Sequence, residues 1–363
     1  MNNTIKLFDP VVGIEEEKAV LKTLRSHVWA SGAGTGKVLE FEEKFRKYTG
    51  ASSCVAVNSG TAALHLALSL FDIKGKEVIL PSLSFVSTAH AILYNGGIPI
   101  FADIKEDTLC LDPDSVRKKI TKKTRIILPV HFGGFPCDMQ QFLEIKKENK
   151  INLVEDAAHA AGASYNREKI GKIGDVTCFS FHPVKNLAMP SGGAITLNRF
   201  KRKQDVEILK SKRWCGITNR KGPKYDISYL GWNYYMSEFS AAIGITQLKK
   251  LDKMNSRRKE IAKLYDKEIN TDKKIPLNSD CSYHLYWILV KNRDYFLKKM
   301  NEKNIELGIH YKPIHTMKLY RNKIKLPVTE NMSSNIITIP IHPNLTQDNL
   351  DEIVKLVNKY AKF

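Results

Sequence analysis

The sequence has no apolar run long enough to cross a membrane, and its six cysteines form no C-x-x-C pair. Cys54, Cys178 and Cys281 lie in or beside apolar runs, which is typical of small buried side chains in a reducing compartment. These absences argue against a membrane protein, a disulfide framework and a metal site. Residues 1–6 lack the pattern of a secretion signal, so we expect a cytoplasmic protein.

Acidic residues are scarce: 38 Asp and Glu face 57 Lys and Arg, for a net charge of +19. Such an excess could indicate a DNA-binding regulator. The basic residues are scattered, however, and often mixed with acids, as in the segment 257–260. Solvated helix faces explain them more simply, and a positive field would also attract a small anionic substrate.

The glycine-rich segment 31–38 resembles a nucleotide P-loop but does not fit the pattern. Ser31 and Val38 stand where the motif needs Gly and Ser or Thr. We interpret the segment as a surface loop before a helix at 39–48, with Ser31 a candidate substrate contact.

Between residues 54 and 197, strand-like runs alternate with helical ones, which predicts an α/β protein with a mostly parallel sheet flanked by helices. The predicted strands are 54–57, 77–80, 98–102, 125–130, 152–155, 176–181 and 194–197. The predicted helices in this part and before it are 14–26, 39–48, 61–70, 85–93, 113–120 and 138–149.

After about residue 240 the pattern changes to that of a smaller α+β domain. We therefore expect a large domain over 1–240 and a small C-terminal domain over 241–363. Its predicted helices are 237–251, 257–269, 295–301 and 348–360, and its predicted strands are 283–290, 305–311 and 336–339.

Lys185 and Asp156 each follow the end of a predicted strand. Taken singly, each is more typical of a loop residue or a helix cap. Together they suggest one chemistry, because a lysine can hold an aldehyde cofactor as a Schiff base while an aspartate keeps its ring nitrogen protonated. That arrangement is the one used with pyridoxal phosphate (PLP). In a parallel sheet the two residues would meet at the carboxyl ends of the strands.

The segment 54–68 predicts a strand, a tight turn at Asn58-Ser59-Gly60 and a helix. Free N–H groups at about Gly60 to Ala62 would face an anion such as a phosphate. An ordinary turn with Ser59 as the N-cap explains the same residues.

With these segments together, the chain resembles the DegT/DnrJ/StrS sugar aminotransferases, PLP enzymes of fold type I. The resemblance runs from about residue 5 to 360. It rests on NSGTAALHLAL at 58–68, PSLSFVSTAHAI at 81–92, VEDAAHAAGA at 154–163, FSFHPVKNL at 179–187, GWNYYMSEFSAAIGITQLKKLD at 231–252 and HYKPIHTMKLY at 310–320.

The resemblance implies roles for residues of this sequence. Lys185 would be the Schiff-base lysine and Asp156 the partner of the ring nitrogen. The other implied cofactor contacts are His159 beside the ring hydroxyl, Phe85 stacked on the ring, Gly60, Thr61, Ala62 and Ser180 at the phosphate, and Asn233 from the neighbouring subunit of a homodimer. His310, Tyr311 and His315 would lie near the sugar, although two surface histidines at a strand end explain that segment equally well.

The implied reaction moves an amino group, by family expectation from glutamate, to a keto-sugar nucleotide. The sequence departs from the family at 188–191, where Ala-Met-Pro-Ser replaces Thr-Thr-Gly-Glu, so the acceptor stays open. A keto-cyclitol such as scyllo-inosose is an alternative acceptor. A PLP-dependent sugar dehydratase is a further alternative, which the retained Lys185 disfavours.

Overall fold

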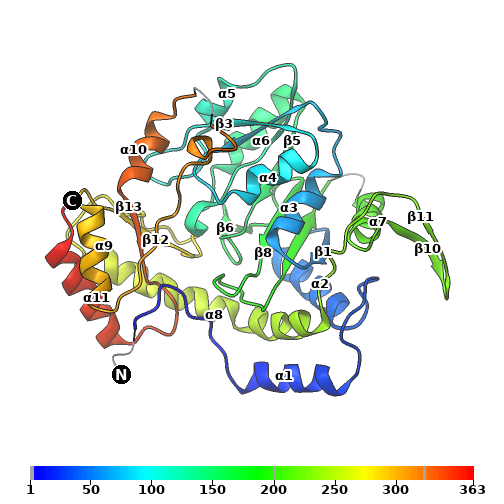
Figure 1. Ribbon diagram of the computed structural model, residues 1–363, viewed down its shortest axis with the longest axis horizontal. Helices are drawn as coiled ribbons and strands as arrows, with labels where there is room; N and C mark the ends of the chain where they lie inside the picture. The colour runs from blue at the N-terminus through cyan, green and yellow to red at the C-terminus, as the bar shows by residue number, and fades with distance from the viewer. Residues whose placement is uncertain (1–3, 200–201, 322–323) are drawn as a thin grey trace.

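A seven-stranded sheet lies at the centre of the computed structural model, which describes residues 4–199, 202–321 and 324–363 (Figure 1). Its strands, from one edge to the other, are β1 (Ser53–Val57), β9 (Gly193–Leu197), β8 (Val176–Ser180), β5 (Asn152–Asp156), β4 (Thr124–Ile127), β2 (Glu77–Pro81) and β3 (Ile98–Ala102). β9 pairs antiparallel with both of its neighbours, and the other pairs are parallel. The predicted α/β class with a mostly parallel sheet is confirmed.

Helices cover both faces of the sheet, so its strands are apolar on both sides. In β8, Cys178 packs into the core on the side of α3, and the next residue, Phe179, packs into the core on the side of α2. The helices around the sheet are α2 (Gly36–Thr49), α3 (Gly60–Leu68), α4 (Ser87–Tyr94), α5 (Pro113–Arg117), α6 (Met139–Asn149) and α7 (Arg202–Lys212). The first helix, α1 (Ile14–Arg25), lies apart from the sheet (Figure 1).

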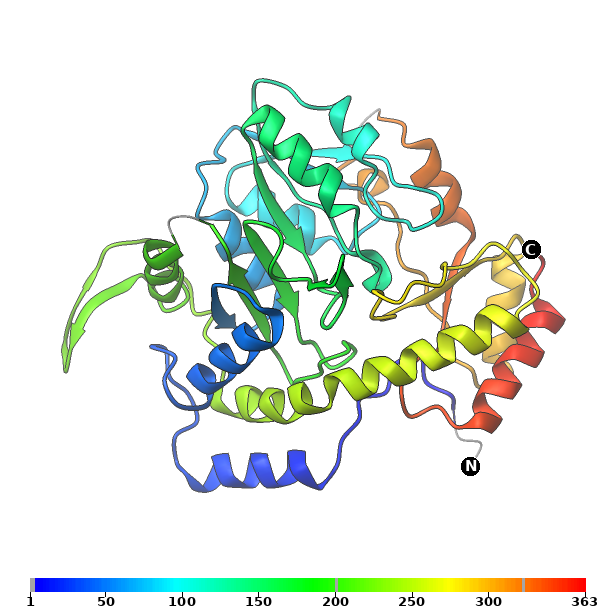
Figure 2. The same ribbon diagram turned by 180° about the vertical axis from the view of Figure 1, so that it is seen from behind.

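One long helix, α8 (Glu238–Glu268), runs beneath the sheet and on into the C-terminal part of the chain (Figure 2). The sequence predicted two helices with a break near 252–256, and that prediction was wrong. Asn255 and Arg258 are buried and donate to the carbonyl oxygens of Ala161 and Ile341. These tertiary contacts outweigh the weak helix propensity of the segment.

The C-terminal part is a small α+β unit, in which β12 (Tyr286–Leu289) pairs antiparallel with β13 (Ile336–Ile339). It also contains α9 (Arg293–Asn301), α10 (Pro327–Asn335) and α11 (Gln347–Tyr360). The strand predicted at 305–311 does not form: Ile305 and Gly308 make only isolated bridges, to Ile5 and Thr338. The domain boundary near residue 240 stays a prediction, and this position lies in the first turn of α8.

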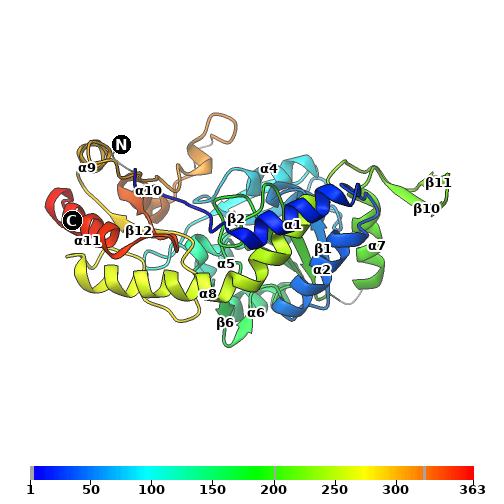
Figure 3. The same ribbon diagram turned by 90° about the horizontal axis from the view of Figure 1, so that it is seen from below.

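The sequence analysis did not predict the hairpin formed by β10 (Ile217–Lys221) and β11 (Lys224–Ile227), which projects from the body of the molecule (Figure 3). Its residues are largely exposed, so no apolar alternation marks the strands. Within the described ranges, no helix is both long and apolar enough to span a bilayer.

Candidate active site

A pocket of about 360 Å³ opens beyond the carboxyl ends of β5 and β8, against the start of α3. The structure brings most of the predicted residues to this pocket from distant parts of the chain. Those that line it are Gly60, Thr61, Phe85, Asp156, His159, Ser180, Lys185, His310 and Tyr311.

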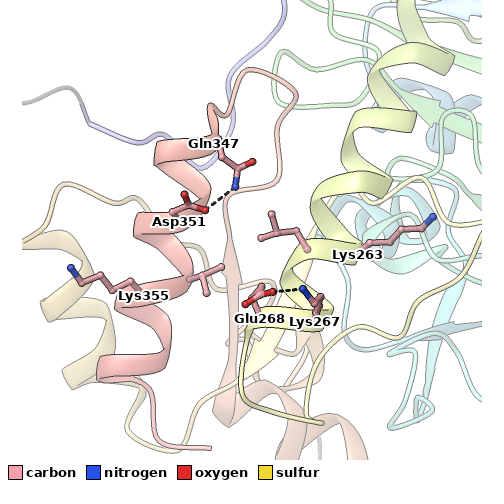
Figure 4. Close-up of a pocket in the computed structure, with 8 residues that line it drawn as sticks. Lys263, Lys267, Glu268, Gln347, Asp351 and Lys355 are labelled. Atoms are coloured by element: carbon pink, nitrogen blue, oxygen red, sulfur yellow. Dashed lines mark hydrogen bonds and ion pairs between the residues drawn. The ribbon is translucent and has the colours of Figure 1, made fainter.

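A second hollow, of about 550 Å³, lies between α8 and α11 and is larger than this pocket, but its residues do not form a catalytic arrangement (Figure 4). Its charged side chains project from outer helix faces, and several pair locally: Lys267 with Glu268 at 3.0 Å, and Gln347 with Asp351 at 2.7 Å. Size alone therefore does not identify the site, whereas buried titratable groups at the sheet edge do.

Lys185 lies in the turn that follows β8, where its N–H donates to the carbonyl of His182. Burial of the side-chain amine lowers the pKa of Lys185 to about 8, against the opposing attraction of Asp156. A larger share of this lysine is therefore uncharged at neutral pH than of an exposed one. An uncharged amine is the form that attacks a carbonyl.

Asp156 is the last residue of β5 and is only 4% exposed. Its Oδ2 accepts a hydrogen bond from the Thr88 hydroxyl at 2.8 Å, and its Oδ1 accepts one from the Ala158 N–H at 3.1 Å. Burial raises the pKa of Asp156, and these hydrogen bonds and the charge of Lys185 act in the opposite direction. The carboxyl group is thus fixed in position. Because it is buried, its charged form would be strongly stabilised by a cation in the pocket.

The turn before α3 has the geometry of an anion site, with one detail that the sequence left open. The Ser59 side chain caps the helix by accepting from the Ala62 N–H at 3.1 Å, so that N–H is already used. The N–H groups of Gly60 and Thr61 precede the first hydrogen bond of the helix. A Cβ on Gly60 would lie 2.7 Å from the Cβ of Ser180, so glycine is needed for the turn to pack against β8.

The protonation of His159 follows from its neighbours. The backbone N–H of Gly133 donates to Nδ1 at 3.2 Å, and burial lowers the pKa of His159 well below its usual value. The proton of this neutral ring therefore sits on Nε2, which lies 3.1 Å from the Tyr311 hydroxyl oxygen. Since that oxygen accepts from His159, the tyrosine can donate its own proton into the pocket.

The sequence analysis did not single out two residues that contact the predicted ones. Thr88 lies inside the segment 81–92 but was not singled out, and its contact with Asp156 is visible only in three dimensions. His284 precedes β12 and its Nε2 lies 3.5 Å from the Nζ of Lys185. A polar residue in the apolar run 283–290 was the available signal.

The remaining predicted residues lie outside the lining of this pocket. Ser31 bonds to Thr35 within its loop, and buried His315 lies 2.7 Å from the Ser82 hydroxyl and 3.2 Å from Glu330. Asn233 is exposed in the single chain, and its carbonyl accepts from the Asn58 side chain at 3.3 Å. Their roles stay predictions.

At 188–191, where the sequence departs from the family pattern, the side chains lie in two different environments. Met189 is 2% exposed and packs into the core between α2 and α8, where its side chain fills the space left by Gly244. Ser191 instead lines the pocket. Of the four residues, Ser191 is therefore the one placed to meet a substrate.

Comparison with known proteins gives consistent matches along the whole chain. The model of the DegT/DnrJ/EryC1/StrS aminotransferase family matches residues 11–358. The chain is 35% identical to the uncharacterized protein MJ1066 of Methanocaldococcus jannaschii and 34% identical to the spore coat polysaccharide biosynthesis protein SpsC of Bacillus subtilis, covering 97% of this chain and 96% of each relative.

Solved structures agree with that match. The putative sugar aminotransferase Spr1654 of Streptococcus pneumoniae, in its PMP form, superposes with a TM-score of 0.93 at 28% identity, covering 98% of this chain and 97% of that one. Its PLP form gives the same TM-score at 27% identity, covering 98% of each chain.

Proposed function

This chain belongs to the DegT/DnrJ/EryC1/StrS aminotransferase family, and from that membership we propose that it transfers an amino group from glutamate to a keto-sugar nucleotide. The product would be an amino sugar for glycan or polysaccharide biosynthesis. Apart from the identity of its two substrates, the chain is a sugar aminotransferase of fold type I, and its cofactor is PLP. The observation that supports the proposal best is that Lys185 and Asp156 face one pocket beside an open helix N-terminus.

The residues of the pocket fit PLP. When bound, PLP accepts electrons from the substrate carbon and carries the amino group between the two substrates. The buried carboxyl of Asp156 suits a protonated ring nitrogen, and the turn at Gly60 and Thr61 with the Ser180 hydroxyl suits a phosphate. Phe85 lies at the pocket, 57% exposed, as a ring free to stack on a planar group.

Lys185 has two proposed tasks. Its amine binds the cofactor covalently, and once released it moves a proton from the Cα of the amino donor, as a base and then as an acid. A pKa of about 8 suits both directions, because neither the charged nor the uncharged form is rare near neutral pH. Asp156 holds the proton on the ring nitrogen by its negative charge.

The acceptor side of the pocket is proposed to consist of Tyr311, His310 and Ser191. Tyr311 can donate into the pocket because His159 already donates to its oxygen. Ser191 replaces a carboxylate of the family pattern, which removes a negative charge from the site. A keto-cyclitol acceptor is the alternative that this change leaves open, and the retained Lys185 disfavours a dehydratase.

A homodimer with shared sites is part of the proposal. Asn233 is exposed near the base of the β10–β11 hairpin and is available to the phosphate of a partner subunit. In addition, α1, Pro183 and residues 188–190 border a groove of about 540 Å³ whose exposed surface is mostly apolar. Apolar surface of this kind is typical of the core of a permanent interface.

We propose that the protein is located in the cytoplasm.

Reduction with borohydride tests the covalent step. The protein is reduced, digested and analysed by mass spectrometry, and the peptide that contains Lys185 should carry the reduced adduct. A Lys185→Arg chain is the control and should carry none. An adduct on other lysines alone would contradict the proposal.

The substrate is tested by incubating the enzyme with glutamate and a panel of keto-sugar nucleotides and keto-cyclitols. Mass spectrometry should detect an amine only on a nucleotide-linked sugar. Amination of the cyclitol alone would select the alternative acceptor. A colourless protein with salt-sensitive affinity for DNA would instead indicate the basic regulator.

A further inference from the structure

His284 is a buried histidine whose ring lies between two other rings and close to Lys185. It is 1% exposed, and it lies 99 positions along the chain from Lys185. The ring of Phe8 stacks on it at 5.4 Å between centroids, with 17° between the planes, and the ring of His159 lies 4.5 Å away. The imidazole is therefore held in one orientation against the end of Lys185.

A chain of amide hydrogen bonds defines which nitrogen of His284 carries the proton. The Asn255 amide donates to the backbone carbonyl of Ala161 at 3.0 Å, which leaves its Oδ1 as an acceptor. The Asn186 amide donates to that oxygen at 2.9 Å and to the carbonyl of Ser282 at 2.8 Å. Because backbone carbonyls only accept, the orientation of both amides is fixed.

The Oδ1 of Asn186 is consequently the atom that faces His284, at 3.3 Å from Nδ1. An amide oxygen accepts, so Nδ1 must carry the proton. Burial, together with the nearby charge of Lys185, lowers the pKa of His284 well below its usual value, so the ring holds no second proton. The lone pair of Nε2 then points at Nζ of Lys185, 3.5 Å away.

We propose that His284 is a positioning residue for Lys185: its Nε2 accepts a hydrogen bond from Nζ, and Asn186 fixes the tautomer that makes this possible. This inference rests on the proposed role of Lys185 in holding the cofactor. The other charged or titratable groups that act on Lys185 or His284 are Asp156, His159, His310 and Arg258, and Lys185 in turn acts on His182. Among these, Asp156 supplies the opposite charge, and His284 supplies a neutral acceptor.

The acceptor should hold Lys185 in its charged form more strongly than an apolar neighbour would, because an ammonium donates a stronger hydrogen bond than an amine. The test measures Lys185 itself in the full-length chain freed of cofactor. Lysines are labelled with a small amine-reactive reagent at a series of pH values, and mass spectrometry follows the peptide that contains Lys185. The labelling midpoint of the natural protein should lie at about 8.

In a His284→Phe chain the ring and its stacking on Phe8 remain, while both nitrogens are lost. The midpoint should fall by about 1 pH unit, so that labelling at pH 7 is about fivefold faster. His284→Gln, whose side-chain oxygen can reach the position of Nε2, should restore the natural midpoint in part. His342→Phe is the control, since His342 is also buried but bonds to the carbonyl of Lys6. An unchanged midpoint in His284→Phe, or an equal shift in the control, would overturn the proposal.

Nitrogen NMR of the unsubstituted protein gives a second test, which measures the tautomer of His284 directly and needs no variant. The His284 signal, assigned by its proximity to the Phe8 ring, should show the tautomer protonated on Nδ1. A proton on Nε2, or on both nitrogens, would refute the positioning role. Absence of the reduced adduct on Lys185 would instead refute the proposed function, so the two failures are distinguishable.

Discussion

The hydroxyl of Thr88 donates a 2.8 Å hydrogen bond to Oδ2 of Asp156, and this contact ties α4 to the end of β5. The Ser84 hydroxyl in turn lies 2.8 Å from that of Thr88. The carboxyl group of Asp156, which would face the cofactor ring, is thus held by Thr88 in the first turn of α4. Ser84, which precedes α4, contacts Thr88 in turn.

The charge of Asp156 should matter more than its shape. In an Asp156→Asn chain we expect cofactor to remain bound and turnover to fall by about 100-fold or more, because a preorganised charge at the ring is lost. Thr88→Val, which replaces the hydroxyl with a methyl group of similar size, should give a smaller fall. Turnover and bound cofactor are measured by steady-state kinetics and absorbance. Equal activity of the Asn chain and the natural protein would contradict the ion-pair role.

Shared active sites predict complementation between subunits. Chains carrying Lys185→Ala and chains carrying Asn233→Ala should each be inactive, and mixing them should restore part of the activity. Heterodimers would contain one site with neither defect, since the two residues would come from different chains. Subunit exchange is verified by tagging one chain. Exchange without recovered activity would argue against a shared site.

The apolar groove beside α1 predicts where the dimer forms. Leu21 lines it and is 47% exposed, so Leu21→Glu should shift the protein from dimer to monomer by placing a charge in the interface. Leu277→Glu is a matched control with the same exposed fraction outside the groove. Sedimentation velocity measures the oligomeric state. If both variants stayed dimeric, the groove would not be the interface.

A buried ion pair should stabilise the fold near the phosphate turn. Arg213 is fully buried and donates to Glu42 at 2.5 Å and to the carbonyl of Ala56 in β1 at 2.7 Å. Arg213→Met leaves the buried carboxylate of Glu42 with the more distant Lys210, at 3.7 Å, as its cationic partner, and should lower the free energy of unfolding by about 3 kcal/mol. Lys210→Met breaks a partly exposed contact with Glu42 and should cost about 1 kcal/mol or less. Urea denaturation compares the two; equal losses would mean that the burial of Arg213 contributes nothing.

The buried histidines predict a loss of stability in acid. Burial, reinforced by the charge of Lys185, lowers the pKa of His310 to about 4, compared with about 6.5 in the unfolded chain. Between these values the unfolded state binds more protons, so stability is present above pH 6.5 and is lost as the pH falls toward 4. His310→Gln should make this decline shallower in urea denaturation measured at several pH values. An identical slope would contradict the assignment.

Much of the candidate site could be predicted because its residues sit at points that local sequence marks. Lys185 and Asp156 follow apolar runs, and parallel strands of one sheet bring their carboxyl ends to one edge. Gly60 and Ser59 mark a turn and a cap through their own conformational preferences. Alternating strands and helices gave the fold class for the same reason.

Other features depended on contacts between segments far apart in the chain. The continuity of α8 through Asn255 was decided by buried hydrogen bonds, and the segment 305–308 forms isolated bridges to residues far away in the chain, Ile5 and Thr338. The hairpin at 217–227 lacks any apolar alternation.

The sequence by itself determined which residues are candidates for the chemistry and the sheet edge at which they gather, because both follow from short-range patterns. Only the tertiary structure decided which side chains lie beside them: Thr88, which donates to Asp156, and His284, whose Nε2 lies 3.5 Å from the Nζ of Lys185. The physical reason is that hydrogen bonds act over about 3 Å in space and carry no signature in sequence distance.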